Sequence, residues 1–220
     1  LITFLENHWK KVENLEFREY DEVKNRERDE FIRDYARVIY STSFRRQQGK
    51  MQLFEVNSKA FHRNRLTHSF EVAQIARGIV DELKKTVQND DSYKYINEIS
   101  KKQIEDNFSK MSVVVETGAL IHDVGNPPFG HHGERVLNSL ASDIGFEGNA
   151  QGIRVLRKIE KKSPEYNGLN LTYRTLAAII KYFVSYDQDK KKFLYKDDYD
   201  ELSNNFKNVL KNANLPFRTI

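Results

Sequence analysis

The chain has 220 residues, 31% of them charged and 39% hydrophobic, and Lys and Arg exceed Asp and Glu by four; this balance is typical of one soluble domain and does not by itself indicate nucleic-acid binding. The absence of cysteine excludes disulfides and thiolate metal sites, so any metal must be held by His, Asp and Glu. No apolar run approaches the roughly 20 residues of a membrane-spanning helix, and we expect a cytoplasmic protein.

The first half of the chain predicts an all-α fold, because prolines are few and helix-forming residues are frequent. We expect a helix over residues 29–48 and a second over residues 66–87, with Asn64 as the N-cap of the second. Residues 84–110 are rich in charged and polar side chains and predict a long charged excursion. The apolar positions at helical spacing are Ile32, Tyr35, Val38 and Ile39 in the first helix and Val72, Ile75, Ile79 and Leu83 in the second.

The second half predicts a buried helix over residues 111–124 that ends at Gly125-Asn126-Pro127-Pro128, because a residue before proline avoids the helical region. The remaining expected elements, in chain order, are helices over 131–142, 149–161 and 172–184, a loop or small β-hairpin within 186–199, and an amphipathic helix over 197–212.

Two histidines and an aspartate fall at positions that we expect to face the protein interior. His68 lies on the apolar stripe of its helix, and His122 follows Val115 and Ala119 at helical spacing. A lone histidine on such a face is more often a hydrogen-bonded core residue than a ligand. Asp123 comes next, however, and a buried carboxylate needs a partner or a metal. Together the three favour one divalent ion among Mn, Fe, Co, Ni and Zn, or Mg if carboxylates and waters complete the site.

A second group of polar residues follows the two prolines. His131 and Glu134 are three residues apart and would share a helix face, where a carboxylate can orient an imidazole for general acid–base chemistry. His132 is less suited, because its direction differs by about 100° in a helix. The alternative interpretation is a surface loop in which these side chains are only solvated.

These motifs resemble a known family. Arg65-Leu66-Thr67-His68, followed by His122-Asp123, is similar to the HD-domain metal-dependent phosphohydrolases. The stretch His122-Asp123-Val124-Gly125-Asn126-Pro127-Pro128-Phe129-Gly130-His131 resembles the narrower dGTPase-like deoxynucleoside triphosphate triphosphohydrolases. Three further segments fit that subfamily, so the resemblance covers about residues 25–195; they are 43–52, 146–151 and 179–182. It implies one HD-type helical domain over residues 1–220, with the 84–110 excursion between the two halves of the metal motif.

The resemblance also implies roles for individual residues. His68, His122 and Asp123 match metal ligands, and His131 and Glu134 match the pair implicated in proton transfer. Arg65 matches an arginine that contacts phosphates, and five more residues fall where nucleotide-binding residues are expected: Gln48, Asn149, Lys181, Tyr182 and Lys192. Without the resemblance, Lys181 and Tyr182 would read equally well as an exposed helix end.

One expected feature is missing from these residues. The family's fourth metal ligand is an aspartate in a Glu-Ala-Ala-Asp-Asp-type motif, and no such motif occurs in this sequence. The sequence also begins without Met. We therefore expect an N-terminal fragment whose fourth ligand lies beyond residue 220, and the fragment alone may lack activity.

The favoured function is hydrolysis of a deoxynucleoside triphosphate, dGTP-like, to the deoxynucleoside and inorganic triphosphate. One alternative is another HD-type phosphohydrolase, acting on a phosphomonoester, a cyclic nucleotide or guanosine tetraphosphate. A second is a regulatory module that binds nucleotides or single-stranded DNA without turnover, which the basic balance and the missing ligand favour. The resemblance also implies a homo-oligomer.

Overall fold

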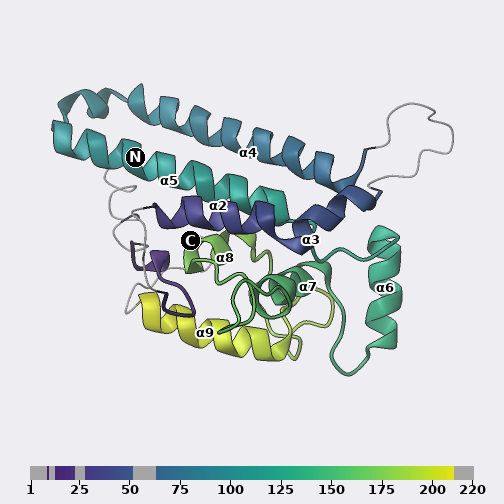
Figure 1. Ribbon diagram of the computed structural model, residues 1–220. Coiled ribbons are helices and arrows are strands. Elements are labelled where there is room, and N and C mark those ends of the chain that lie inside the picture. Colours follow the sequence, from purple (N-terminus) through teal and green to yellow (C-terminus); the bar gives the residue numbers. More distant parts are fainter. Residues whose placement is uncertain (1–8, 10–12, 23–27, 52–62, 211–220) are drawn as a thin grey trace.

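The computed structural model describes residues 9, 13–22, 28–51 and 63–210. Within these residues every regular element is helical and β-structure is limited to isolated bridges, which confirms the all-α prediction (Figure 1). No helix in this part of the chain is long and apolar enough to cross a membrane. The elements are η1 (Glu13–Glu16), α2 (Glu30–Tyr40), α3 (Thr42–Arg45), η2 (Arg46–Gly49), α4 (Arg65–Gln88), η3 (Asp91–Tyr95), α5 (Glu98–Ile121), α6 (Gly130–Leu140), α7 (Gly148–Arg154), the π-helical η4 (Val155–Ile159), α8 (Tyr173–Ile179) and α9 (Lys196–Leu210).

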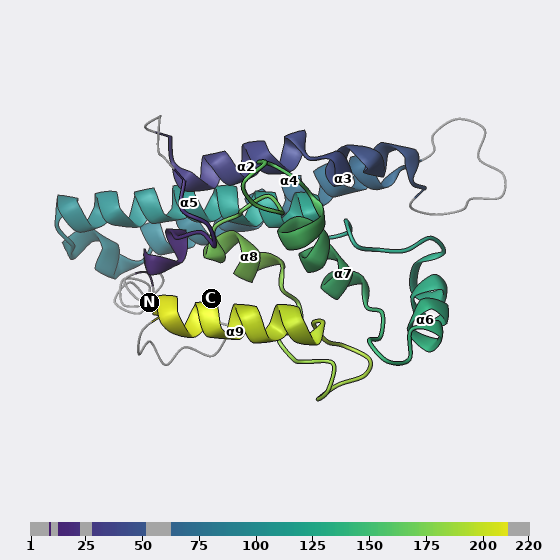
Figure 2. The ribbon, with the colours of Figure 1, turned by 60° about the horizontal axis from the view of Figure 1, so that its bottom comes forward.

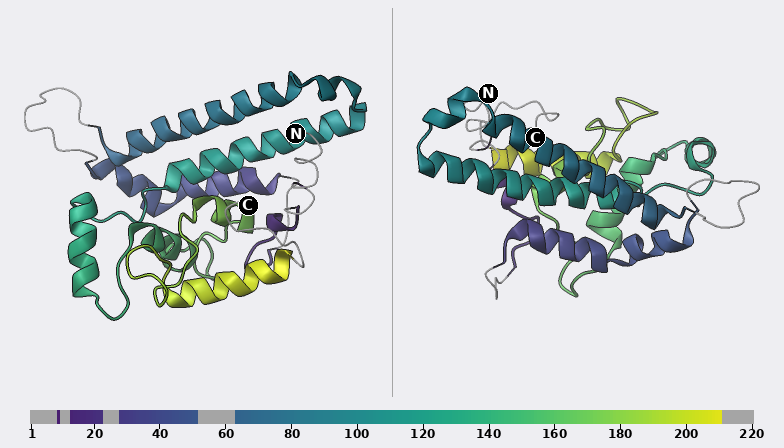
Figure 3. Two further views of the ribbon diagram at one scale, coloured as in Figure 1. Left: turned by 180° about the vertical axis from the view of Figure 1, so that it is seen from behind. Right: turned by 90° about the horizontal axis from the view of Figure 1, so that it is seen from above.

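The architecture is built on a long pair of helices. α4 and α5 run side by side in opposite directions, and α2 and α8 pack against α5 (Figures 1 and 3). α7 packs against α8, and α9 lies across the far side of the molecule from the α4–α5 pair (Figure 2). α6 stands at one edge and has no buried residue. The start of α4 and the end of α5 therefore meet at the end of the molecule that also carries α6.

The boundaries predicted for α4 are confirmed, but its predicted core stripe is wrong. Asn64 caps the helix by accepting a hydrogen bond from the Thr67 backbone N–H. Ile75, Ile79 and Leu83 are 60%, 58% and 50% exposed. The apolar residues that α4 buries are Ala73, Val80 and Val87, which repeat every seven residues. α4 packs chiefly on one helix, α5, so only this narrow heptad seam is covered and the broader apolar stripe stays outside.

The charged segment 84–110 is the closed end of the α4–α5 pair. α4 continues to Gln88, and α5 already begins at Glu98, where Asn97 caps it by accepting from the Ser100 backbone N–H. Ile104 and Phe108 on this part of α5 are buried. The helix expected over 111–124 is therefore the second half of a longer helix.

The helix expected over residues 29–48 is divided into α2, α3 and η2. It starts after Asp29, as predicted, but ends at Ser41, whose hydroxyl accepts from the Phe44 backbone N–H and begins α3. Val38 is buried and Tyr35 and Ile39 are partly buried. Ile32 is 52% exposed, so its placement in the core was wrong.

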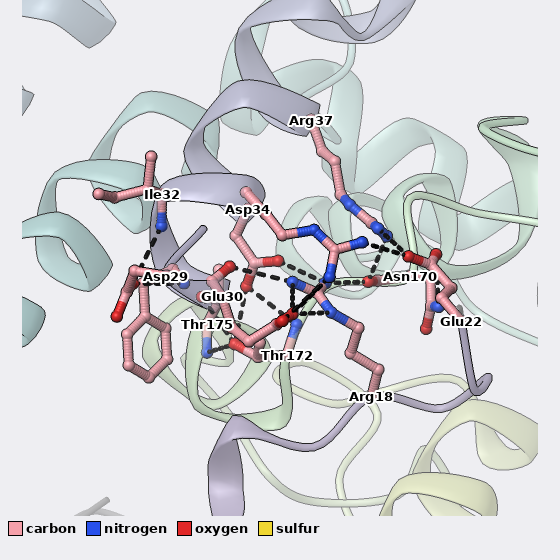
Figure 4. Close-up of polar contacts among 12 residues, drawn as sticks. Arg18, Glu22, Asp29, Glu30, Ile32, Asp34, Arg37, Asn170, Thr172 and Thr175 are labelled. Carbon is pink, nitrogen blue, oxygen red and sulfur yellow. Dashed lines mark hydrogen bonds and ion pairs between the residues drawn. The ribbon is translucent and has the colours of Figure 1, made fainter. Parts of the chain in front are cut away.

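α2 instead buries two charged side chains, which form a network that we call the Asp34 cluster; its members are Arg18, Glu22, Asp34, Arg37, Asn170 and Thr172 (Figure 4). Asp34 accepts hydrogen bonds from Arg18 Nη1 at 2.6 Å and from the backbone and hydroxyl of Thr172 at 2.9 and 2.7 Å. Thr172 also caps α8. The cluster thus fastens the N-terminal segment and the start of α8 to α2.

The helices after α5 occur in the predicted order, but α8 ends earlier than predicted. α6, α7 with η4, and α9 fall where helices were expected. α8 stops at Ile179, because the Asn149 side chain bonds both the Ile179 carbonyl and the Lys181 backbone N–H at 2.7 and 3.0 Å. The small hairpin allowed for within 186–199 does not form; the segment makes one isolated parallel bridge, Ser185 with Leu194.

Candidate metal centre

Three potential ligands meet where α4 begins and α5 ends. His68 lies in the first turn of α4, and His122 and Asp123 directly follow α5. Their ligand atoms all lie within 4.8 Å of one another. Asp123 Oδ2 is 3.9 Å from His68 Nε2, and Asp123 Oδ1 is 3.4 Å from His122 Nε2. Both separations are shorter than two metal–ligand bonds of about 2.1 Å placed end to end, so the residues fit a divalent ion.

Neighbouring atoms orient two of these ligands. His122 Nδ1 lies 2.7 Å from the Ala119 carbonyl oxygen, which can only accept, so Nδ1 carries the proton and Nε2 keeps a lone pair for a metal. Asp123 Oδ1 accepts from Asn126 Nδ2 at 2.5 Å. Nδ1 of His68 is buried without a hydrogen-bond partner among the residues that the structure describes.

The two imidazoles have opposite pKa shifts. Burial lowers the pKa of His68, and the nearby His122 lowers it further. The negative charge of Asp123 raises this pKa, but by less. Burial also lowers the pKa of His122, but the hydrogen bonds with Asp123 and Ala119 outweigh it and leave that pKa raised. His68 therefore favours the neutral form that ligates metals. The surroundings of His122 favour a positive charge, and a bound cation would supply that charge in place of a proton.

The predicted proton-transfer pair lies on the first turn of α6. His131 Nδ1 is 3.8 Å from Glu134 Oε2. The His131 side chain is 86% exposed, whereas that of Glu134 is only 15% exposed. Phe129 and Gly130 both have positive φ, so the chain enters α6 through a left-handed turn that favours glycine. The solvated-loop alternative fits the exposure of His131 but not its place on a helix or the burial of Glu134.

Two glycines bring the loop after Asp123 against the start of α7. A Cβ on Gly125 would collide with the backbone of Gly148 and Gly152. A Cβ on Gly148 would lie 2.5 Å from Asn126 Oδ1 and 3.4 Å from Glu134 Oε2. The carboxylate of the predicted proton-transfer pair is therefore packed beside the loop that holds the metal ligands.

Arg65 and Asn149 make backbone contacts. Arg65 is 7% exposed, and its guanidinium donates to the carbonyls of Asn126 and Pro127 at 2.6 and 2.8 Å. Asn149 holds the end of α8, as described above. Both residues shape the site, and their predicted contacts with nucleotide stay predictions.

Three of the remaining predicted residues come together. The ammonium groups of Lys181 and Lys192 lie 5.5 and 5.3 Å from the centre of the Tyr182 ring. The charge of Lys181 also lowers the pKa of His122 slightly, so Lys181 lies within electrostatic range of that ligand. Gln48 lies on η2 with an exposed side chain and shares no hydrogen bond with them in the described part of the chain.

The sequence interpretation missed two residues of the site, Asn126 and Glu147. Asn126 bonds the ligand Asp123, and Glu147 caps α7 by accepting from the Ala150 backbone N–H at 2.8 Å. Glu147 precedes Gly148-Asn149 at a helix start, where the helix dipole favours an acidic residue, although Glu is not a usual N-cap residue. Its second contact, with Lys192, has no such local signal.

Comparisons with known proteins agree with this site. The family model described as HD domain matches residues 65–201, which include the three candidate ligands and the His131–Glu134 pair. The deoxyguanosinetriphosphate triphosphohydrolase-like protein 2 of Vibrio cholerae is 50% identical over 194 residues, 87% of this chain and 42% of that protein. The protein of the same name from Mesorhizobium japonicum is 46% identical over 164 residues, 70% of this chain and 31% of that protein.

A third relative, the deoxyguanosinetriphosphate triphosphohydrolase-like protein of Shewanella sediminis, is 37% identical over 198 residues, 90% of this chain and 40% of that protein. The chain thus spans less than half the length of these relatives. Because the HD-domain model matches more than half of its residues, around a group of side chains that fits a divalent ion, the chain belongs to the HD-domain family.

Proposed function

We propose that the protein, in its complete form, hydrolyses a deoxynucleoside triphosphate, dGTP-like, to the deoxynucleoside and inorganic triphosphate. The observation that carries this proposal is the convergence of His68, His122 and Asp123 at the end of the molecule that carries α6. The names of the relatives, deoxyguanosinetriphosphate triphosphohydrolase-like proteins, support the substrate class. On this view residues 1–220 form one HD-type domain of a cytoplasmic homo-oligomer.

The proposed reaction breaks the bond between the α-phosphorus and the 5′ oxygen, and the oxygen of water ends on the triphosphate. A divalent metal held by His68, His122 and Asp123 would supply a Lewis acid and lower the pKa of bound water. His131 turns Nδ1 toward Glu134, which leaves Nε2 to exchange a proton with the water or the departing 5′ oxygen.

The cations of the site suit the other half of the substrate. Lys181, Lys192 and Arg65 would neutralise the charge of the triphosphate as it leaves. The ammonium groups of both lysines lie over the Tyr182 ring, and this ring can pack against the nucleotide. Gln48 and Asn149 complete the proposed nucleotide contacts.

The test is a product assay on the full-length protein, with each of the four dNTPs and each candidate metal in turn. Stoichiometric release of triphosphate and deoxynucleoside is the expected result. Release of orthophosphate or pyrophosphate would instead assign another HD-type phosphohydrolase. The assay must be run with metal-free protein as the blank, so that metal-dependent turnover is separated from contamination.

A second candidate is a regulatory module that binds nucleotides or single-stranded DNA without turnover. The net charge of +4 and the exposed Lys181 favour it. Binding of dNTP or single-stranded DNA by the full-length protein at micromolar concentration, with no product under any metal, would assign this role. Turnover with triphosphate release would exclude it as the main function.

A further inference from the structure

We infer that Glu147 is a positioning residue of the proposed reaction: through Lys192, its carboxylate holds Glu134 in place beside His131. The inference rests on the proposed function for its kinetic consequence, but its structural part concerns only three charged side chains. These three residues come from the start of α6, the cap of α7 and the segment before α9.

Lys192 lies between two carboxylates. Its Nζ is 3.3 Å from Glu134 Oε1 and 3.2 Å from Glu147 Oε1. The Glu147 side chain is 4% exposed and that of Glu134 15% exposed, against 39% for Lys192. Two nearly buried carboxylates that share one cation depend on it, because without the lysine they would repel each other in a poorly solvated place.

Glu147 is the better-fixed end of this arrangement. Its Oε2 accepts from the Ala150 backbone N–H at 2.8 Å while Oε1 faces Lys192, so both oxygens are engaged. Burial lowers the pKa of Lys192, but Glu147 and then Glu134 raise it overall, so the ammonium stays charged. Glu147 contributes more to that increase than Glu134 does.

The two oxygens of Glu134 are divided in the same way. Oε1 faces Lys192, and Oε2 faces His131 Nδ1. The 3.8 Å between Oε2 and Nδ1 is longer than a hydrogen bond, but a small rotation of the exposed His131 side chain would let Glu134 accept from Nδ1–H and favour the tautomer whose Nε2 is free to take a proton. An ammonium group has three hydrogens, so Lys192 can hold both carboxylates and still offer one to the triphosphate. The predicted contact of Lys192 with substrate is compatible with this second role.

The decisive variant is Glu147→Gln in the full-length protein. Glutamine keeps an oxygen that can cap α7 but removes the charge that holds Lys192. We expect unchanged metal content, a kcat lower by roughly 10- to 100-fold, a KM changed by less than about threefold, and a shifted pH profile of kcat. Lys192→Gln should lower kcat by at least as much, and Lys192→Arg should restore most of it, because a guanidinium can bridge the same two carboxylates.

The control is Lys158, which is 30% exposed and pairs with Asp197, Asp198 and Glu201 at 3.1, 3.4 and 3.0 Å. Lys158→Gln removes the same kind of ion pairs outside the site and should leave kcat unchanged. The Glu147→Gln, Lys192→Gln double variant should be little slower than Lys192→Gln alone, because the two act through one contact. Equal losses of kcat in Lys158→Gln and Lys192→Gln, or a Glu147→Gln enzyme with unchanged kcat and pH profile, would overturn the inference.

A readout that needs no turnover separates this inference from the proposed function. The tautomer of the His131 ring can be measured by 15N NMR in the unmodified protein and in Glu147→Gln. We expect the proton to shift from Nδ1 toward Nε2 in the variant, whether or not the protein hydrolyses dNTPs. An identical tautomer in both proteins would refute the positioning role even if the proposed reaction is correct.

Discussion

The molecule contains two clusters of polar side chains, each built around a buried aspartate, that differ in composition and geometry. In the Asp34 cluster the hydrogen bonds are short (Figure 4). Asp34 accepts from Arg18 and Thr172 at 2.6 to 2.9 Å, and Arg37 donates to the carbonyls of Leu169 and Asn170 at 2.7 and 2.8 Å. In the group His68, His122 and Asp123, the Asp123 carboxylate lies 3.4 Å from His122 Nε2 and 3.9 Å from His68 Nε2.

The difference separates a structural network from a ligand site. The Asp34 cluster satisfies its charges with protein atoms and so joins three segments of the fold. In the His–Asp group, two imidazole nitrogens and a carboxylate face one another at separations that a bound divalent ion would also span. Variants in the first should therefore change stability, and variants in the second should change ligand binding and chemistry.

The largest expected effect is loss of the metal. Asp123→Ala should reduce divalent-metal affinity by more than ~100-fold, because outer-shell partners alone are worth 10- to 100-fold. Elemental analysis and metal titration of the full-length protein measure it. The control is Asp34→Asn, which should keep the metal and lose roughly 1–3 kcal/mol of unfolding free energy, because Arg18 keeps Glu30 as a charge partner but loses the second carboxylate. Undiminished metal in Asp123→Ala would remove the site assignment.

The next effect concerns chemistry without metal loss. His131→Ala should keep the metal and bind dNTP, yet hydrolyse it roughly 10²–10⁴-fold more slowly, as expected for loss of a general acid or base. Glu134→Ala should show a similar defect, and the double variant little more, because the two act as a unit. Stopped-flow product release and metal analysis together check this. If His131→Ala lost its metal, this histidine would belong to the coordination shell instead.

The sequence predicted the parts of this comparison that depend on local signals. His122-Asp123 at a helix end, the proline turn and the cap at Asn64 are each read within a few residues, and the structure has them at the predicted places. The expected inward direction holds for Asp123, which is buried, but not for His122, which is exposed. Ile75 and Ile79 were misplaced because a stripe records only that a helix is amphipathic, whereas their exposure depends on how much of α4 other helices cover.

The rest could not be read from local pattern because its partners are distant in the chain. Asp34 meets Thr172 across 138 residues, and Lys192 meets Glu147 across 45. The end of α8 depends on Asn149, 30 residues earlier. A charged residue inside a helix gives no sign of whether such a partner exists, so its burial follows from the tertiary fold alone.

A smaller effect should appear in the acid stability of the Asp34 cluster. Burial raises the pKa of Glu22, but hydrogen bonds from Arg37, Tyr166 and Asn170 outweigh it and lower the pKa to about 2. Because its pKa is lower in the folded state than in the unfolded state, ionised Glu22 stabilises the folded protein by at most about 3 kcal/mol. This stabilisation is complete above pH ~5 and is lost as the pH falls toward 2. In Glu22→Gln, the free energy of unfolding should therefore decrease less between pH ~5 and ~2 than in the unmodified protein.

Urea titrations at successive pH values measure this contribution. The matched control is Asp187→Asn, because Asp187 has a lowered pKa in an exposed pair with Lys196 and should leave the pH dependence unchanged. If Glu22→Gln retained the full pH dependence, the acid sensitivity would belong to other carboxylates.

The smallest effect is expected at Arg65, which shares features of both clusters. Like Arg37, it is 7% exposed and donates to two backbone carbonyls. Arg37 also pairs with the Glu22 carboxylate, whereas no carboxylate pairs with Arg65 among the residues that the structure describes. A poorly solvated cation without a counterion favours an anion, and the phosphate of the proposed substrate would supply one.

Arg65→Gln should therefore lower kcat/KM for dNTP by a factor equivalent to about 1.5–3 kcal/mol of transition-state stabilisation, the usual loss for a charge-assisted hydrogen bond. It should also weaken the stabilisation of the protein by added triphosphate. Arg37→Gln should lower stability while leaving the response to triphosphate intact, since its charge is already balanced by Glu22. Steady-state kinetics and thermal shifts with inorganic triphosphate distinguish the two arginines. Equal responses of both variants to triphosphate would assign Arg65 to the loop that it clamps, Asn126-Pro127, and remove it from the substrate contacts.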